Sequence, residues 1–264
     1  MAVAPVFLSR QRVAVPMSEA ERKMRVDLAA CYRLIALNGM DDLLATHISA
    51  RVPGKEEHFL INPYGLLFCQ VTASNLVKVD LEGNIVSDSP WGINPAGFVI
   101  HSAIHGARPE IACIIHTHTI AGMAIACLEE GLLPLSQKSL RFYNRIAYHD
   151  YEGKSDDLDE RARLVRDIGA SNAMVLRNHG LLACGATVGR AYHTMLNLEK
   201  SCKIQLEAMR SGGKLIQLSH AVQEHAARQH DRDDVPSGIQ GKGRPDVWPA
   251  LLMMLNKIDP GYKD

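Results

Sequence analysis

The sequence predicts a mixed α/β domain over residues 18–210, with an N-terminal extension over 1–17 and a C-terminal tail over 211–264. Two patterns carry this prediction. Short apolar runs bounded by turn residues indicate strands, and longer segments with apolar residues every three or four positions indicate helices. The composition agrees with it, because 47% hydrophobic and 22% charged residues in 264 positions are typical of a globular protein with a sizeable core.

The first half of the domain begins with a helix. Ser18 and Glu21 form an S-x-x-E capping box at its start, and the Asn38–Gly39 pair ends it. Three strands follow at 47–52, 59–62 and 76–81. A turn at 82–84 then predicts a hairpin to residues 85–86.

The second half of the domain alternates between helices and strands. Pro95 opens a helix that ends near residue 108, a buried strand covers 111–115, and a helix rich in small residues covers 120–128. A helix over 156–169, a strand over 173–176 and a long helix over 187–209 complete the domain. The tail is polar apart from an apolar stretch at 248–255, and we expect it to pack on its own or a neighbouring subunit.

Charge and composition exclude several classes of protein. The 29 basic and 29 acidic residues balance, so nothing indicates a nucleic acid or an anionic membrane as partner. The uncharged run 111–128 is at the lower limit of the length that spans a membrane and holds two histidines at its centre, so we do not interpret it as a membrane span. The N-terminus lacks the pattern of a secretory signal. Six scattered cysteines without a CxxC motif suggest reduced thiols and a cytoplasmic location.

The sharpest candidate site is the pair His116 and His118 at the end of the strand over 111–115. Residues i and i+2 of a strand point to one face, so both imidazoles can reach one point, while Ile115 and Thr117 face away. His179 follows another apolar strand and precedes a glycine, so it is a plausible third ligand. Three imidazoles suit Zn²⁺, Mn²⁺ or Fe²⁺. The spacing alone is equally compatible with histidines that only form hydrogen bonds to neighbouring loops.

The chain resembles the class II aldolase/adducin family over roughly residues 20–210. The resemblance rests on INPYGLLF (61–68), the run NPAGFVIHSAIHGARPEIACIIHTHT (94–119), GLLPLSQ (131–137) and LRNHGLLACG (176–185). It implies a nine-stranded, largely antiparallel central sheet between helix layers and a tetramer with active sites at subunit boundaries. It also implies that His116, His118 and His179 hold one divalent metal, whose Lewis acidity stabilises an enediolate or enolate.

The departures from the family pattern concern the groups beside this metal. Gly97 stands where the sugar-phosphate aldolases of the family have their acid/base glutamate, and Ser139 stands where the dehydratase branch has its own. Pro95 and Ala96 replace two phosphate-binding serines, and His47 replaces an asparagine of the same pocket. We therefore expect a substrate without phosphate.

The remaining polar residues supply candidates for chemistry and for binding. His101 lies one turn after Gly97 and is predicted to be a fourth ligand or a proton donor, with a buried, backbone-bonded histidine as the equal alternative. Catalytic candidates are His101, His47 and Gln137; substrate-binding candidates are Asn62, Ser49, Gly65 and Arg141.

Three functions follow from these observations. The first is a metal-dependent lyase, an aldolase or a decarboxylase, acting on a small non-phosphorylated carboxylate or carbonyl compound; decarboxylation tolerates the missing glutamate because it removes no proton. The second is a non-haem iron oxygenase of the same fold. The third is a non-catalytic, adducin-like scaffold. The expected cofactor is one divalent ion, zinc before manganese or iron. The expected assembly is a homotetramer with contacts through residues 121–126 and the stretch near Trp248.

Overall fold

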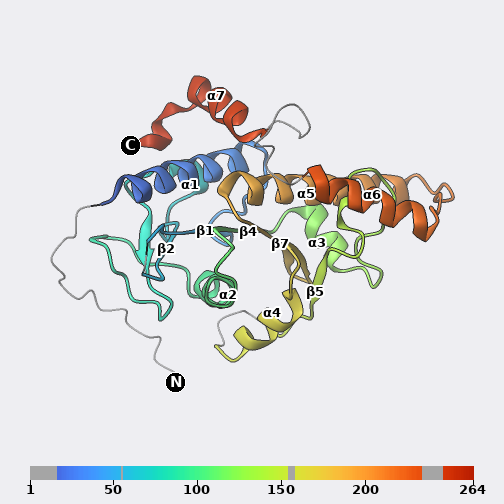
Figure 1. Ribbon diagram of the computed structural model, residues 1–264, viewed down its shortest axis with the longest axis horizontal. Helices are drawn as coiled ribbons and strands as arrows, with labels where there is room; N and C mark the ends of the chain where they lie inside the picture. The colour runs from blue at the N-terminus through green and yellow to red at the C-terminus, as the bar shows by residue number, and fades with distance from the viewer. Residues whose placement is uncertain (1–16, 55, 154–157, 234–245) are drawn as a thin grey trace.

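A seven-stranded sheet runs through the centre of the protein (Figure 1). The computed structural model describes residues 17–264 apart from 55, 154–157 and 234–245. The strands are β1 (His47–Arg51), β2 (Phe59–Ile61), β3 (Val77–Val79), β4 (Cys113–Thr117), β5 (Ala147–His149), β6 (Ala173–Leu176) and β7 (Gly180–Gly185).

The strands lie in the order β3-β2-β1-β4-β7-β6-β5. Every neighbouring pair is antiparallel except β5 and β6, so the predicted largely antiparallel sheet is confirmed. The described residues form seven strands, not the nine that the family resemblance implied. The hairpin expected at 85–86 is a single bridge between Val79 and Ile85, and the amides of Asp80 and Val86 donate to the carbonyls of Asn84 and Lys78 on either side of it.

Seven α-helices surround this sheet in the described residues. They are α1 (Glu19–Leu37), α2 (Pro95–Ala107), α3 (Ile120–Ala126), α4 (Glu160–Ile168), α5 (Val188–Arg210), α6 (His220–Asp233) and α7 (Trp248–Ile258). Short 3₁₀ turns are η1 (Phe68–Gln70), η2 (Ser139–Phe142) and η3 (Pro260–Lys263). The predicted helix over 156–169 is shorter, and its first two residues lie outside the described part of the chain.

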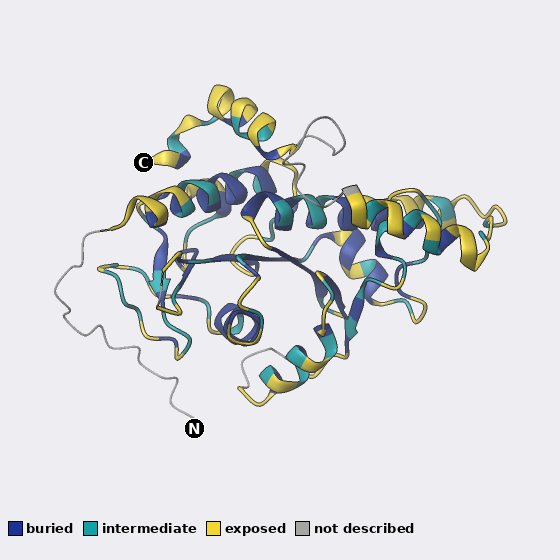
Figure 2. Ribbon diagram, viewed as in Figure 1, coloured by how far each residue is buried: buried dark blue, intermediate teal, exposed yellow. Residues whose placement is uncertain are grey.

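The helices form a layer on each face of the sheet. Figure 1 shows α1 and α5 on one face and α2 and α4 on the other, with α7 outside α1. Each layer closes its own core, and strand β4 serves both: Cys113 and Ile115 belong to the core under α1 and α5, whereas Ile114 belongs to the core under α2 and α4. This alternation buries both faces of β4, as the dark central strands in Figure 2 show.

Two strands were not predicted. The sequence indicated no element over 180–185, whose sequence GLLACG has glycine at both ends, yet all six residues of β7 are buried between β4 and β6. β5 is only three residues long and lacks a recognisable pattern. The strand predicted at 111–115 begins and ends two residues later, which brings His116 into the sheet.

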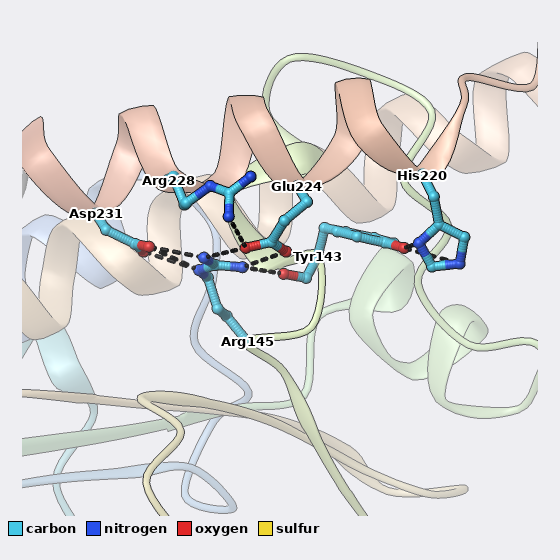
Figure 3. A network of polar contacts seen from close by, with 6 residues as sticks. All are labelled: Tyr143, Arg145, His220, Glu224, Arg228 and Asp231. Carbon is cyan, nitrogen blue, oxygen red and sulfur yellow. Dashed lines mark hydrogen bonds and ion pairs between the residues drawn. The ribbon is translucent and has the colours of Figure 1, made fainter.

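The tail packs on its own chain. Trp248 of α7 lies against Gly189 and Tyr192 of α5, and its ring nitrogen donates to Asp27 of α1. Helix α6 is held by Arg145, whose guanidinium bonds to Glu224 and Asp231 (Figure 3). The Tyr143 hydroxyl contacts His220 at the start of the same helix.

Two further findings concern the chain as a whole. None of the helices in the described residues is both long and apolar enough to span a membrane. All six cysteines are free; Cys69 and Cys127 are exposed, and the other four lie in the interior.

Candidate metal centre

Three imidazoles converge where β4 ends and β7 begins. The side chains of His116, His118 and His179 place one ring nitrogen each within 4.8 Å of the others. The Nε2 atoms of His116 and His118 are 2.8 Å apart, and the His179 ring centre lies 4.7 Å and 4.9 Å from theirs. His116 is buried, whereas His118 and His179 are half-buried, so the cluster faces both the interior and solvent.

The local backbone explains this convergence. His116 is the fourth residue of β4, and His118 follows the strand by one residue, so the two rings share a face as predicted. Thr117 points the other way and donates to the sulfur of Met195. His179 lies in the tight turn between β6 and β7, where Asn178 has a positive φ of 55°.

Gly180 is required at this turn. A Cβ atom there would overlap the carbonyl oxygen of Thr117 and would lie 3.0 Å from Cδ2 of His118. The close approach of the two backbone segments, which brings His179 to the other histidines, is therefore open only to glycine.

Second partners orient two of the three rings. The Nδ1 atom of His116 lies 2.9 Å from the carbonyl oxygen of Leu181, and the Nδ1 atom of His118 lies 3.2 Å from a carboxylate oxygen of Asp42. Both partners are acceptors, so each Nδ1 carries the proton and each Nε2 keeps its lone pair for a ligand. Sequence analysis missed Asp42, because a loop aspartate gives no local signal.

The electrostatics of the cluster favour neutral imidazoles. Burial lowers the pKa of His116 well below 6.5 and lowers the pKa of His179 to about 4. Burial also lowers the pKa of His118, against the opposing effect of Asp42. Neutral rings with free Nε2 atoms are the form that binds a metal.

The donor set therefore fits a divalent metal. Two ligand atoms bound to zinc at 2.0–2.1 Å are separated by about 3.3 Å in a tetrahedron, close to the 2.8 Å between Nε2 of His116 and of His118. Three nitrogen ligands from the protein leave at least one position for water or substrate, the arrangement of catalytic rather than structural sites.

A second set of histidines lies behind the cluster. His47 pairs with His116 across β1 and β4, and their ring centres are 4.8 Å apart. The Nδ1 atom of His47 lies 2.9 Å from Nε2 of His101, and the Nδ1 atom of His101 lies 2.5 Å from the hydroxyl oxygen of Ser49. That oxygen lies 2.8 Å from Nε2 of His105, which completes a chain of four side chains between β1 and α2.

This hydrogen-bonded series of side chains shows where three of the predicted residues lie. Both ring nitrogens of His101 are engaged by His47 and Ser49, so the structure places His101 behind the cluster with neither nitrogen free for an ion. Ser49 is fully buried between two histidines. His47 is the member of the chain that adjoins the cluster.

Gly97 makes room for His47. A Cβ atom at position 97 would lie 2.8 Å from both Cγ and Cδ2 of the His47 ring. The imidazole therefore occupies the space into which a side chain of the first turn of α2 would extend.

The other predicted binding residues lie around β2. Asn62 is buried, and its side-chain oxygen accepts a hydrogen bond of 3.0 Å from the Tyr32 hydroxyl. Gly65 is exposed, with a φ of 110° that favours glycine, and Trp91 is its neighbour.

Gln137 and Arg141 lie beside helix α6. The backbone carbonyl of Gln137 accepts from His230, and the guanidinium of Arg141 contacts the same ring. Ser139, which replaces the dehydratase glutamate of the family, is buried and bonds within its own turn to Ser136.

Two further residues adjoin the cluster. The exposed Tyr151 has its ring centre 6.4 Å from that of His179. Thr119 caps α3 directly after His118, and its hydroxyl donates to the buried carboxylate of Glu199 on α5. The tyrosine follows β5 in a loop-like segment where the family resemblance implied substrate contacts, with packing as the alternative. The Thr119 contact spans 80 residues.

Comparison with known proteins places this geometry in a family. The family model described as Class II Aldolase and Adducin N-terminal domain matches residues 26–206. The crystal structure of an aldolase II superfamily protein from Pseudomonas syringae superposes with a TM-score of 0.85 at 46% identity, covering 94% of this chain and 98% of that one. An L-fuculose 1-phosphate aldolase from Glaciozyma antarctica gives 0.78 at 28% identity, covering 95% and 97%.

Adducins are similar as well. Rat alpha-adducin is 39% identical over 274 aligned residues, which cover 99% of this chain but only 36% of the adducin. The protein therefore belongs to the class II aldolase and adducin family, as the motifs predicted. The similar proteins are named as aldolases and as adducins, so membership of the family alone does not define the activity of this chain.

Proposed function

We propose that the protein is a divalent-metal-dependent lyase that acts on a small, non-phosphorylated carbonyl or carboxylate compound. The observation that carries this proposal is the cluster of His116, His118 and His179, in which the Nδ1 atoms of the first two are held by acceptors and the ligand nitrogens converge. Histidines that only stabilised the fold would not need ring nitrogens that are available to a ligand and partly exposed to solvent.

The position of each residue indicates its role in the proposed site. The three cluster histidines would hold the ion, which supplies Lewis acidity to a substrate oxygen. Asp42 and the Leu181 carbonyl keep two of the rings in the ligating tautomer. His47 lines the cluster on the side of β1, and Tyr151 adjoins His179.

The first turn of α2 supports a substrate without phosphate. Pro95 and Ala96 have no hydroxyl, and the amide of Ala96 already donates to the side chain of Asn94. Losing two or three charge-assisted hydrogen bonds, at about 1.5–3 kcal/mol each, weakens binding of a phosphate dianion by several powers of ten. We expect no appreciable cleavage of fuculose, rhamnulose or ribulose phosphates by the metal-loaded protein, measured as aldehyde release. Efficient turnover of any of them contradicts this expectation.

Metal analysis of protein purified without added metal tests the cluster. We expect one divalent ion per chain, zinc before manganese or iron, and a sharp loss of occupancy when His116, His118 or His179 is replaced by alanine. His225→Ala is the matched control, because His225 is exposed on α6. Unchanged occupancy in all three cluster variants would end the proposal.

The same measurement separates the alternatives. Iron as the ion bound after purification favours an oxygenase of the same fold, and the absence of any ion favours an adducin-like scaffold, the role suggested by the similarity to alpha-adducin. If an ion is bound, a screen of small acids for release of carbon dioxide and of aldehyde distinguishes decarboxylation from aldol cleavage.

We also propose a homo-oligomer, a tetramer by family resemblance, in the cytoplasm. The surfaces first expected at the contacts are largely used within the chain: Ala121 and Ala126 are buried, and Trp248 packs on α5. Exposed apolar side chains remain beside the cluster, namely Leu43, Ile120 and Met123 with exposed fractions of 70%, 89% and 40%. Light scattering at micromolar concentration tests this assembly, and a monomer contradicts it.

A further inference from the structure

A buried carboxylate on α5 contacts the turn that follows β4. Glu199 is 2% exposed, and one of its oxygens accepts a hydrogen bond from the hydroxyl of Thr119. The Nζ atom of Lys203, one turn further along α5, lies 3.0 Å from the other oxygen. Burying a carboxylate is costly unless it is paired, and an apolar side chain would fill the space between α3 and α5 at lower cost. The carboxylate therefore indicates that a directional contact, and not packing alone, is needed at this position.

The partner of this carboxylate, Thr119, is fixed by three hydrogen bonds. Its hydroxyl donates to Glu199 and accepts from the amide of Gly122 at 3.1 Å, which caps the first turn of α3. Its backbone carbonyl accepts from the amide of Met123 at 2.8 Å. The residue is only 7% exposed. The turn between β4 and α3 is thus tied to both α3 and α5 through one threonine.

The position of His118 depends on this turn. β4 ends one residue before it, so His118 lies outside the strand, whereas His116 lies within the strand. The backbone of His118 is therefore held by the strand on one side and by Thr119 on the other. Its ring contacts Asp42, but that side chain is 47% exposed and lies in a loop.

Helix α5 bonds to the residue on either side of His118. Met195 lies one turn before Glu199 on this helix, and its sulfur accepts from the hydroxyl of Thr117 at 3.4 Å. A thioether sulfur is a weak acceptor, so the carboxylate that bonds to Thr119 makes the stronger of the two contacts.

We propose that Glu199 and Thr119 are positioning residues for the metal cluster. Their hydrogen bond holds the turn after β4 on α5 and thereby keeps the ring of His118 where it can share an ion with the other two histidines. The effect on metal affinity rests on the proposed metal site, whereas the contact between the turn and α5 depends only on the residues that form it.

Cobalt binding measures the effect on the cluster. Thr119→Val removes the hydroxyl with little change of shape, and Glu199→Leu removes the acceptor. Each should weaken Co²⁺ affinity by about tenfold, the lower end of the usual cost of losing a group that orients a ligand. Thr119→Ser keeps the hydroxyl and Glu199→Gln keeps an acceptor oxygen, so both should retain most of the affinity. Equal losses in the conservative and the disruptive variants would overturn the proposal.

A double variant tests whether the two side chains act through one contact. Thr119→Val combined with Glu199→Leu should lose no more affinity than the weaker-binding single variant. Losses that multiply would show independent effects and overturn the proposal.

Two controls separate positioning from a general loss of stability. Ser201→Ala removes a buried hydroxyl of α5 that donates to a carbonyl of its own helix, and Thr187→Val removes the hydroxyl that caps the start of α5. Both should lower the stability of the fold and leave Co²⁺ affinity unchanged. A tenfold loss of affinity in either control would overturn the proposal.

Metal-free protein supplies a readout that needs no ion. With ¹³C-labelled histidine, His118→Asn identifies the ring signals of His118 in the NMR spectrum. We expect one sharp set in the native protein and broadened or multiple signals in Thr119→Val, or in Glu199→Leu if the first variant does not fold. Unchanged ring signals in these variants would overturn the proposal. A native protein that binds no Co²⁺ would contradict the proposed metal site instead, so the two failures are distinguishable.

Discussion

Asp42 controls the cluster through the ring of His118. Its carboxylate accepts from Nδ1 at 3.2 Å and so keeps Nε2 available. Replacing Asp42 by alanine should weaken metal affinity by about 10–100-fold, the usual cost of losing such a partner. Competition with a chelator measures this change. Asp41→Ala is the control, since the neighbouring aspartate forms none of the hydrogen bonds described, and an equal loss there would contradict the assignment.

At the scale of single residues, periodicity was enough to predict that His116 and His118 share a face but not what surrounds them. His116 and His118 were predicted because the two-residue period of a strand is written in the sequence itself. Asp42 lies 76 residues from His118, and Ser49 lies 56 residues from His105. Only the pairing of β1 with β4 and the packing of α2 on β1 bring such residues together. Local patterns therefore could not predict that His101 and Ser49 are engaged with each other.

At the scale of elements, Arg145 connects helix α6 to the rest of the molecule through two carboxylates. Its guanidinium bonds to Glu224 and Asp231 at once, and both carboxylates raise its pKa (Figure 3). These groups are partly exposed, so we expect Arg145→Ala to cost about 1–2 kcal/mol locally and to accelerate amide exchange in α6 roughly 5–30-fold. Exchange measured by mass spectrometry tests this prediction.

A neighbouring arginine provides the comparison for that experiment. Arg228 lies 4.0 Å from Glu224 and is 59% exposed, so Arg228→Ala should change exchange in α6 little. Equal effects of the two variants would show that α6 is held by its packing alone. The sequence predicted the apolar stretch of α7 but not the packing of α6. The charged residues of α6 meet Arg145 only in the folded protein, so no local pattern identifies it as their partner.

At the scale of the whole molecule, the buried histidines make stability depend on pH. The pKa of six histidines is lowered in the folded protein, to about 4 for His179 and about 3 for His105; the others are His47, His101, His116 and His118. Below about 6.5 the unfolded chain binds protons that the folded chain does not, so stability falls as pH falls from 6.5 toward those values.

The expected size of this effect is large. Each fully buried histidine contributes at most about 1.4 kcal/mol per pH unit in that window. We expect the urea midpoint of metal-free protein to fall steeply between about pH 6.5 and pH 4.5 and to change little from pH 7 to 8. His225→Ala should leave the curve unchanged. A flat profile through pH 5 would contradict the neutral, buried state of these rings.

The hydrogen bonds of the sheet have a consequence for how an ion enters. His116 pairs with Leu182 across β4 and β7, and the turn that carries His179 leads directly into β7. Paired strands thus set the spacing of the proposed ligands, so the three side chains are ordered when the chain folds. Small zinc-binding domains become ordered only when the metal binds, and they unfold without it. We therefore expect the native topology of this protein to persist when a bound ion is removed or exchanged for another.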